Sequence, residues 1–213
     1  AWQQHIALGL IQPGAATSLA VHPTQLYEAA LILLLILWFR APWPGTRQAM
    51  HQMVVGTLIH TAYLGGVFTS INLGMPAGMT SLIVSLQPVL TAILALLLFQ
   101  HGLLSRQWMG LGLGLLGVSL VISQSRQIGF SEIDAGSLFA VFIALAGISL
   151  GTVYQKQFGQ NTHLLTGSFY QFLATAIWMG LLSITIESQQ ITWSLQLMAS
   201  LAWMVVMLSI ISI

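Results

Sequence analysis

The chain has 213 residues, of which 56% are hydrophobic and 4% are charged, with a net charge of +1. A soluble domain usually carries about a quarter charged residues, so this composition excludes an ordinary water-soluble fold. The small net charge excludes a nucleic-acid partner, and the absence of cysteine excludes disulfides and thiolate metal sites. We therefore expect an all-α, polytopic transmembrane helix bundle that lies in a lipid bilayer.

Seven apolar stretches follow one another along the chain. Six of them contain no Asp, Glu, Lys or Arg, and the first contains only Glu28, near its start. A helix needs roughly 20 apolar residues to cross the hydrocarbon, so each stretch is a candidate span. The predicted spans are 24–39, 53–73, 76–99, 108–123, 137–155, 163–186 and 194–213. The chain begins at Ala1 and stops within an apolar run at Ile213, so we expect it to be a fragment with further spans outside it.

Basic residues gather on one side of the predicted membrane. If the spans alternate in direction, four of the five basic residues share one side, while all four acidic residues lie on the other. The four are Arg40, Arg47, Arg106 and Lys156. Lysine and arginine concentrate in cytoplasmic loops. We therefore predict that loops 40–52 and 156–162 are cytoplasmic and that loop 124–136 is outside.

A proline lies about halfway along the 76–99 span. Pro88 has no amide hydrogen for the carbonyl of Val84, so the helix is expected to kink there. Transporters often use broken helices to line a substrate path, although a neighbouring helix can also satisfy a simple kink. We predict that Ser85, Gln87 and Pro88 line a substrate pathway.

Two further spans contain polar residues that are candidates for the same pathway. His60 shares a helix face with Tyr63, and an ionisable group inside a span is a functional hypothesis by default. His60 could carry a proton, line the pathway, or be a neutral imidazole bonded to a neighbouring helix. Gln171 in the 163–186 span could form a binding wall or a contact between helices. No acidic residue is expected deep in a span, so a carboxylate proton relay is not predicted.

The 108–123 span is rich in glycine. Gly112-x-Gly114-x-x-Gly117 matches the dinucleotide fingerprint formally, but that motif requires a preceding strand, which an apolar helix cannot supply. Gly110, Gly114 and Gly117 instead predict a small-residue face for close helix packing. The six histidines form no His-x-x-x-His pair, so we predict no metal site, no cofactor and no catalytic residue.

Three motifs between Tyr63 and Ser123 resemble one family. They are Tyr63-Leu-Gly-Gly-Val67, Pro76-Ala-Gly-Met-Thr-Ser-Leu-Ile-Val-Ser-Leu-Gln-Pro-Val-Leu-Thr-Ala92 and Arg106-Gln-Trp-Met-Gly110. From about Phe39 onward, the chain resembles the EamA-like branch of the drug/metabolite transporter superfamily. Gly151-Thr-Val-Tyr-Gln-Lys156 resembles the start of the second repeat of that family. The Gly-Glu pair usual after the fourth helix is replaced by Gln100-His101.

This resemblance implies a ten-helix fold made of two inverted five-helix repeats. The chain would then carry helices two to eight, with 23–123 as the end of the first repeat and 137–213 as the start of the second. Residues 1–22 stay unassigned. The implied function is a transporter, not an enzyme, that moves a small organic metabolite or drug across the bacterial inner membrane. Export by alternating access is expected, and a homodimer is left open.

A second resemblance concerns only the N-terminal stretch. Val21-His-Pro-Thr-Gln-Leu-Tyr-Glu-Ala-Ala30 resembles a motif of prolipoprotein diacylglyceryl transferase, which would place Tyr27 and Glu28 in a structural-catalytic region. The arginine- and glycine-bearing segments of that enzyme are not found downstream. A transferase-like enzyme, a junction between two genes, a chance match and a non-catalytic membrane scaffold are the alternatives to the transporter.

Overall fold

The computed structural model describes residues 24–99, 104–124, 134–186 and 195–206, and within these ranges every regular element is a helix. This confirms the predicted all-α class. The helices are α2 (Thr24–Phe39), α3 (Thr46–Gly56), the π-helix η1 (Thr57–Ala62), α4 (Tyr63–Asn72), α5 (Ala77–Val84), α6 (Gln87–Phe99), α7 (Ser105–Gln124), α8 (Ala135–Phe158), α9 (Leu164–Ile186) and α10 (Leu195–Val206).

The helices match the predicted spans with shifted ends. Among the described residues, four helical segments are long and apolar enough to cross a membrane: Thr46–Asn72, Ala77–Phe99, Ala135–Phe158 and Leu164–Leu182. The segment predicted as 53–73 begins earlier, at Thr46, because a polar first turn extends it beyond its apolar part. The last predicted span is helical over Leu195–Val206, and its remaining residues lie outside the described ranges.

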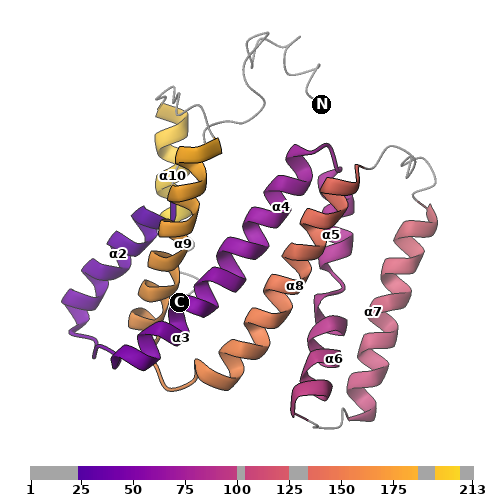
Figure 1. Ribbon diagram of the computed structural model, residues 1–213, viewed down its shortest axis with the longest axis horizontal. Coiled ribbons are helices and arrows are strands. Elements are labelled where there is room, and N and C mark those ends of the chain that lie inside the picture. The colour runs from indigo at the N-terminus through magenta and orange to yellow at the C-terminus, as the bar shows by residue number, and fades with distance from the viewer. Residues whose placement is uncertain (1–23, 100–103, 125–133, 187–194, 207–213) are drawn as a thin grey trace.

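The helices stand side by side in a row, with α2 at one end and α7 at the other (Figure 1). The long segment α3–η1–α4 packs against α8 and α9, while α2 packs against α9 and α6 against α8. Two small apolar clusters lie in this row. Ile32 and Ile36 of α2 pack on Phe169 and Phe172 of α9, and Val141 of α8 packs on α5.

Small residues allow the central helices to approach closely. A Cβ added at Gly56 would lie 2.6 Å from the Cα of Gln171, and one at Gly66 would lie 2.6 Å from the carbonyl oxygen of Ala140. A Cβ at Gly147 would lie 3.0 Å from the carbonyl oxygen of Leu58. At each of these positions a Cβ would be too close to the neighbouring backbone. The helices can therefore approach this closely only because one of them has a glycine there.

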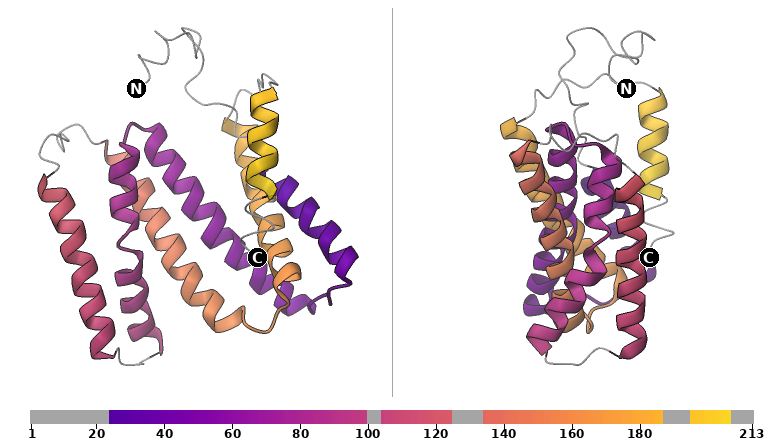
Figure 2. Two further views of the ribbon diagram at one scale, coloured as in Figure 1. Left: turned by 180° about the vertical axis from the view of Figure 1, so that it is seen from behind. Right: turned by 90° about the vertical axis from the view of Figure 1, so that its right-hand side faces the viewer.

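The glycines singled out in the sequence are not among these close contacts. A Cβ added at Gly110, Gly114 or Gly117 would meet no described atom within 4 Å. The reason is the position of α7, which lies at the edge of the row, next to α6, as the left view of Figure 2 shows. The close packing predicted for these glycines is therefore absent from the described part of the chain.

The helix ends agree with alternating spans. The end of α2, the start of α3, the start of α7 and the end of α8 lie along the same edge of the bundle, at the bottom of Figure 1. These are the ends beside which the sequence places its four predicted cytoplasmic basic residues. The opposite end of α8 begins at Asp134, whose carboxylate accepts a hydrogen bond from the amide of Ser137 at 3.2 Å.

Glu28 is buried although it lies near the start of α2. In the structure its side chain is only 4% exposed, because it lies on the side of α2 that also buries Ala29 and Ile32. An acidic residue is therefore largely covered by the protein.

Candidate functional site

The centre of the long segment α3–η1–α4 is wound as a π-helix. Residues Thr57–Ala62 form this wider turn between two α-helical parts. Single π-turns inside α-helices are rare and occur frequently at functional sites. The turn lies against Gly147 and Gly151 of α8, where an added Cβ would meet Leu58 at 3.0 Å in each case. Close packing on α8 thus holds the irregular turn in the middle of the row.

His60 projects from this turn towards α9. Its ring stacks on the ring of Phe172, with centroids 5.0 Å apart and planes inclined by 27°. The side chain of Gln171 lies close enough to the imidazole to interact with it. The structure therefore brings together two of the predicted pathway residues, His60 and Gln171, from opposite halves of the chain.

A line of polar contacts continues from Gln171 towards the α8–α9 connection. The Gln171 Nε2 donates to Gln52 Oε1 at 2.7 Å. Gln52, which is 2% exposed, donates from Nε2 to the carbonyl oxygen of Gly159 at 3.1 Å and to Thr162 Oγ1 at 3.0 Å. The Thr175 hydroxyl lies within hydrogen-bonding distance of the carbonyl oxygens of Gly56, at 3.2 Å, and Gln171, at 2.9 Å. This polar line joins α3, α9 and the connection before α9.

The predicted break at Pro88 is present. Helix α5 ends at Val84 and α6 begins at Gln87. The amide of Leu86 donates to the carbonyl oxygen of Ile83, three residues back instead of four, at 3.1 Å. The Ser85 hydroxyl donates to the carbonyl oxygen of Leu82 at 2.6 Å. A side-chain hydroxyl therefore satisfies one of the backbone acceptors at the interruption.

The other predicted pathway residues lie in different places. Gln87 Nε2 is 3.5 Å from Thr152 Oγ1 of α8, which is the limit of a hydrogen bond. Tyr63 is the first residue of α4, directly after the π-turn, and is partly buried. Ser85 and Pro88 face a pocket between α6 and α7 and do not join the line around His60.

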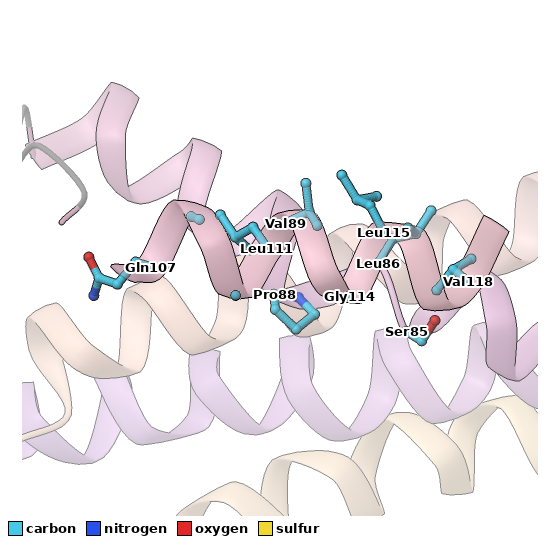
Figure 3. Close-up of a pocket in the computed structure, with 11 residues that line it drawn as sticks. Ser85, Leu86, Pro88, Val89, Gln107, Leu111, Gly114, Leu115 and Val118 are labelled. Atoms are coloured by element: carbon cyan, nitrogen blue, oxygen red, sulfur yellow. The ribbon is translucent and has the colours of Figure 1, made fainter. Parts of the chain in front are cut away.

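This pocket has a volume of about 380 Å³. Figure 3 shows Pro88 and Ser85 on one wall and Gln107, Leu111 and Gly114 of α7 on the other. Of the described residues that line it, Ser85 and Gln107 alone have polar side chains, so the remaining lining is apolar. Such a lining suits an acyl chain or a hydrocarbon side chain better than a polar solute.

Buried hydroxyl groups without partners lie on the central helices. Among the described residues, Thr61 Oγ1 of the π-turn, Thr91 Oγ1 of α6 and Ser149 Oγ of α8 are buried and have no hydrogen-bond partner. Unsatisfied buried polar atoms are uncommon and costly. They offer hydrogen-bonding capacity to a solute that enters between these helices.

Sequence reasoning missed several members of the site. The sequence predicts Gln52 just outside a span and gives no reason to single out Thr162 or Phe172. For Gln52, the sequence feature that could have indicated a role is a polar side chain directly before an apolar stretch. Nothing in the sequence marks Phe172, because a phenylalanine in an apolar helix is ordinary. Only the structure shows that its ring stacks on His60.

Several apolar helices long enough to cross a bilayer, arranged in one row, define a polytopic α-helical membrane protein. The family model of the EamA-like transporter family matches residues 14–123, which is more than half of the chain. The chain therefore belongs to the EamA-like transporter family, as the resemblance implied. The matched range contains His60, Tyr63, Ser85, Gln87 and Pro88. It does not extend to Gln171, so the second repeat over 137–213 stays a prediction.

The chain is also similar to part of an enzyme. It is 35% identical over 82 residues to a phosphatidylglycerol–prolipoprotein diacylglyceryl transferase of Chlorobaculum tepidum. That similarity covers 32% of this chain and 28% of the transferase, so the chain spans well under a third of that relative. No solved structure matches the chain.

Proposed function

We propose that this transporter moves a small organic metabolite or drug outward across the bacterial inner membrane by alternating access. The observation that carries the proposal is the polar line of His60, Gln171 and Gln52 around a π-turn, in the middle of membrane-spanning helices. Polar groups within a bilayer are costly, and they mark solute paths in helical membrane proteins. The family assignment supports transport in general, and the chemistry of the line supports a solute of limited charge.

The chemistry of the line indicates which solutes fit. It offers amide and imidazole groups together with the flat ring of Phe172, and none of these carries a fixed charge. A small solute with hydrogen-bonding groups and a flat or apolar part could replace the contacts between Gln171 and its neighbours. The unpartnered hydroxyl of Thr61 adds another donor on the same turn.

A second set of contacts supports alternating access. His51 Nδ1 lies 2.7 Å from the Tyr154 hydroxyl, and its ring stacks on Phe158 with centroids 4.9 Å apart. Gln48 Nε2 donates to the carbonyl oxygen of Phe158 at 2.8 Å. These contacts join the start of α3 to the end of α8, at the edge of the bundle that we propose to be cytoplasmic. Opening the site to the cytoplasm would require them to separate.

A mixed pool of candidate solutes tests the proposal. Purified protein is reconstituted into liposomes loaded with a low-molecular-weight metabolite extract supplemented with ethidium, and released compounds are identified by mass spectrometry. We expect at least one compound to leave faster than from protein-free liposomes. The substitutions Gln171→Ala and His60→Ala should each slow that flux about tenfold, which corresponds to roughly 1.4 kcal/mol.

The matched control is His163→Ala, which removes an exposed imidazole beside the start of α9. Its flux should equal that of the unchanged protein. If no compound leaves faster than from protein-free liposomes, the proposal is overturned. Equal flux in the Gln171→Ala variant and the unchanged protein would refute the assigned site.

The similarity to the transferase favours one other function, which is diacylglyceryl transfer to a lipoprotein. That function predicts transfer from phosphatidylglycerol to the thiol of a lipoprotein-signal peptide, and its loss in Glu28→Gln. A mobility shift of the peptide would detect the product. Transfer above the level of empty liposomes would favour the enzyme over the transporter.

A further inference from the structure

The pocket between α6 and α7 has no part in the polar line around His60. Helix α7 lies next to α6 in the row (Figure 2), but it makes no extensive contact with another element in the described part of the chain. A pocket of about 380 Å³ lies between the two helices instead. Unfilled space between helices forfeits packing energy, so an occupant of this pocket would join α7 to the rest of the protein.

The walls of this pocket are apolar and reach the protein surface. Pro88 and Val89 of α6 lie on one side, and Leu111 and Leu115 of α7 lie on the other (Figure 3). Gly114 keeps the space open, because a Cβ there would meet no described atom within 4 Å. Pro88 and Gly114 are both exposed. The surroundings of a membrane span are hydrocarbon, and an apolar cavity holds water poorly, so the occupant that fits is a hydrocarbon chain.

The length of the pocket matches one half of a bilayer. Gln107 is the first residue of α7 that lines it, and Val118 is the last. At about 1.5 Å of rise per residue, these two residues are roughly 16 Å apart along the helix. The hydrocarbon core of a bilayer is about 30 Å thick, so each leaflet contributes roughly 15 Å. The pocket therefore has the length of one lipid acyl chain.

The width of the pocket excludes a helix as its occupant. A volume of about 380 Å³ over roughly 16 Å of length corresponds to a mean cross-section of roughly 25 Å². A helix about 10 Å wide has a cross-section of roughly 80 Å². A single extended hydrocarbon chain therefore suits the pocket better than a span from a second copy of the protein.

Polar residues lie at the end of the pocket where α7 begins. Gln107 lines the pocket there, and its neighbour Arg106 is exposed. Trp108 is 55% exposed and is typical of the membrane–water interface. This end of α7 lies on the edge of the bundle that the sequence predicts to be cytoplasmic. Basic residues at that surface attract the anionic headgroups of the cytoplasmic leaflet.

From this geometry we propose that the pocket between α6 and α7 binds one anionic phospholipid of the cytoplasmic leaflet. One acyl chain lies along Leu111, Gly114 and Val118, and the headgroup phosphate lies beside Arg106. The bound lipid fills the space between the two helices and holds α7 against α6. The proposal goes beyond transport and does not depend on it.

Photo-crosslinking locates the lipid. The full chain is reconstituted into phosphatidylcholine liposomes that contain a phosphatidylglycerol with a diazirine in the middle of one acyl chain, and crosslinked residues are identified by mass spectrometry. We expect crosslinks to concentrate on pocket residues such as Val89 and Leu115. Leu37 of α2, which is 63% exposed, reports ordinary contact with the bilayer. If pocket residues are crosslinked no more often than Leu37, the proposal is overturned.

Filling the pocket should displace the lipid. Gly114→Leu puts a side chain into it, and Ala92→Leu does so independently from the α6 wall. Each should reduce crosslinking in the pocket about tenfold. The matched control is Gly112→Leu, on the same helix, because Gly112 is not among the residues that line the pocket and a Cβ there would also meet no described atom within 4 Å. Unchanged crosslinking in both pocket variants would refute the site.

A probe with the same acyl chains but a phosphatidylcholine headgroup tests the role of charge. Because a basic residue near the membrane surface favours anionic lipid, the unchanged protein should crosslink the phosphatidylglycerol probe about fivefold more often. Arg106→Gln should abolish this preference, whereas Arg47→Gln, at the start of α3, should keep it. Equal crosslinking of both probes by the unchanged protein would overturn the anionic headgroup. None of these measurements uses a transported solute, so a failure of the proposed function would leave their outcome unchanged.

Discussion

His60 of the π-turn stacks on Phe172 of α9, with ring centroids 5.0 Å apart. Phe172 also packs on the cluster formed by Ile32 and Ile36 of α2. One aromatic ring thus contacts both the irregular turn and the helix that buries Glu28. This relationship makes α9 the element through which changes at either place reach the other.

Replacement of Phe172 tests this relationship. Phe172→Leu keeps an apolar side chain but removes the ring that stacks on His60. Because an aromatic pair contributes about 0.5–1.5 kcal/mol beyond its buried area, the half-saturation concentration for solute should rise roughly two- to tenfold. The measurement is concentration-dependent flux from liposomes. Phe139→Leu, at a ring on α8 that is 69% exposed, is the control and should change nothing.

The hydrogen bond between Gln171 and Gln52 should contribute to stability. Gln52→Leu leaves the Gln171 amide, the Gly159 carbonyl and the Thr162 hydroxyl without this partner. We expect a loss of about 1–3 kcal/mol in unfolding free energy, measured by thermal unfolding in detergent. In a double-mutant cycle with Gln171→Leu, the two effects should not add, because both substitutions remove the same bond. Strict additivity would contradict a direct interaction.

Glycine-to-alanine substitutions test whether close helix packing occurs at Gly56, where the structure shows it, or at Gly110, where the sequence predicts it. Gly56→Ala places a Cβ 2.6 Å from the Cα of Gln171, so backbone must move and the protein should lose about 1–3 kcal/mol. Gly110→Ala meets no described atom within 4 Å and lies inside a helix, so it should stabilise by up to about 1 kcal/mol. Thermal unfolding in detergent compares the two. If Gly110→Ala costs as much as Gly56→Ala, an additional neighbour packs on α7.

The contacts at the end of α8 should control access from the proposed cytoplasmic side. Tyr154→Phe removes the hydroxyl that lies 2.7 Å from His51 Nδ1 and keeps the ring. Loss of one such bond, about 1 kcal/mol, should raise the open population roughly fivefold. The chain has no cysteine, so maleimide labelling of Val55→Cys, at a site that is 0% exposed, reports opening directly. Trp108→Phe, on α7, is the control, and an unchanged labelling rate in Tyr154→Phe would refute the gating role.

Much of the architecture follows from the sequence, because hydrocarbon imposes strict demands on a chain. Backbone groups in a bilayer must bond within their own helix, so charge-free apolar runs predict helices at 24–39, 76–99 and 163–186, close to the observed ends. The interruption at Pro88 was predictable too, since the missing amide hydrogen is a covalent property. The earlier start of α3, at Thr46, was missed because its first turn is polar.

The arrangement of these helices was decided only in three dimensions. Nothing local distinguishes Gly110, which has no close neighbour, from Gly56, which contacts the backbone of Gln171, because the difference lies in the opposing helix. The Gln171–Gln52 bond joins residues 119 positions apart, and the π-turn that presents His60 depends on packing against α8. Sequence by itself determined which segments are helices in lipid, since that depends on each segment's own solvation. Tertiary structure decided which polar groups contact each other, and it also decided that Glu28 is buried. Both depend on which other segment a helix packs against.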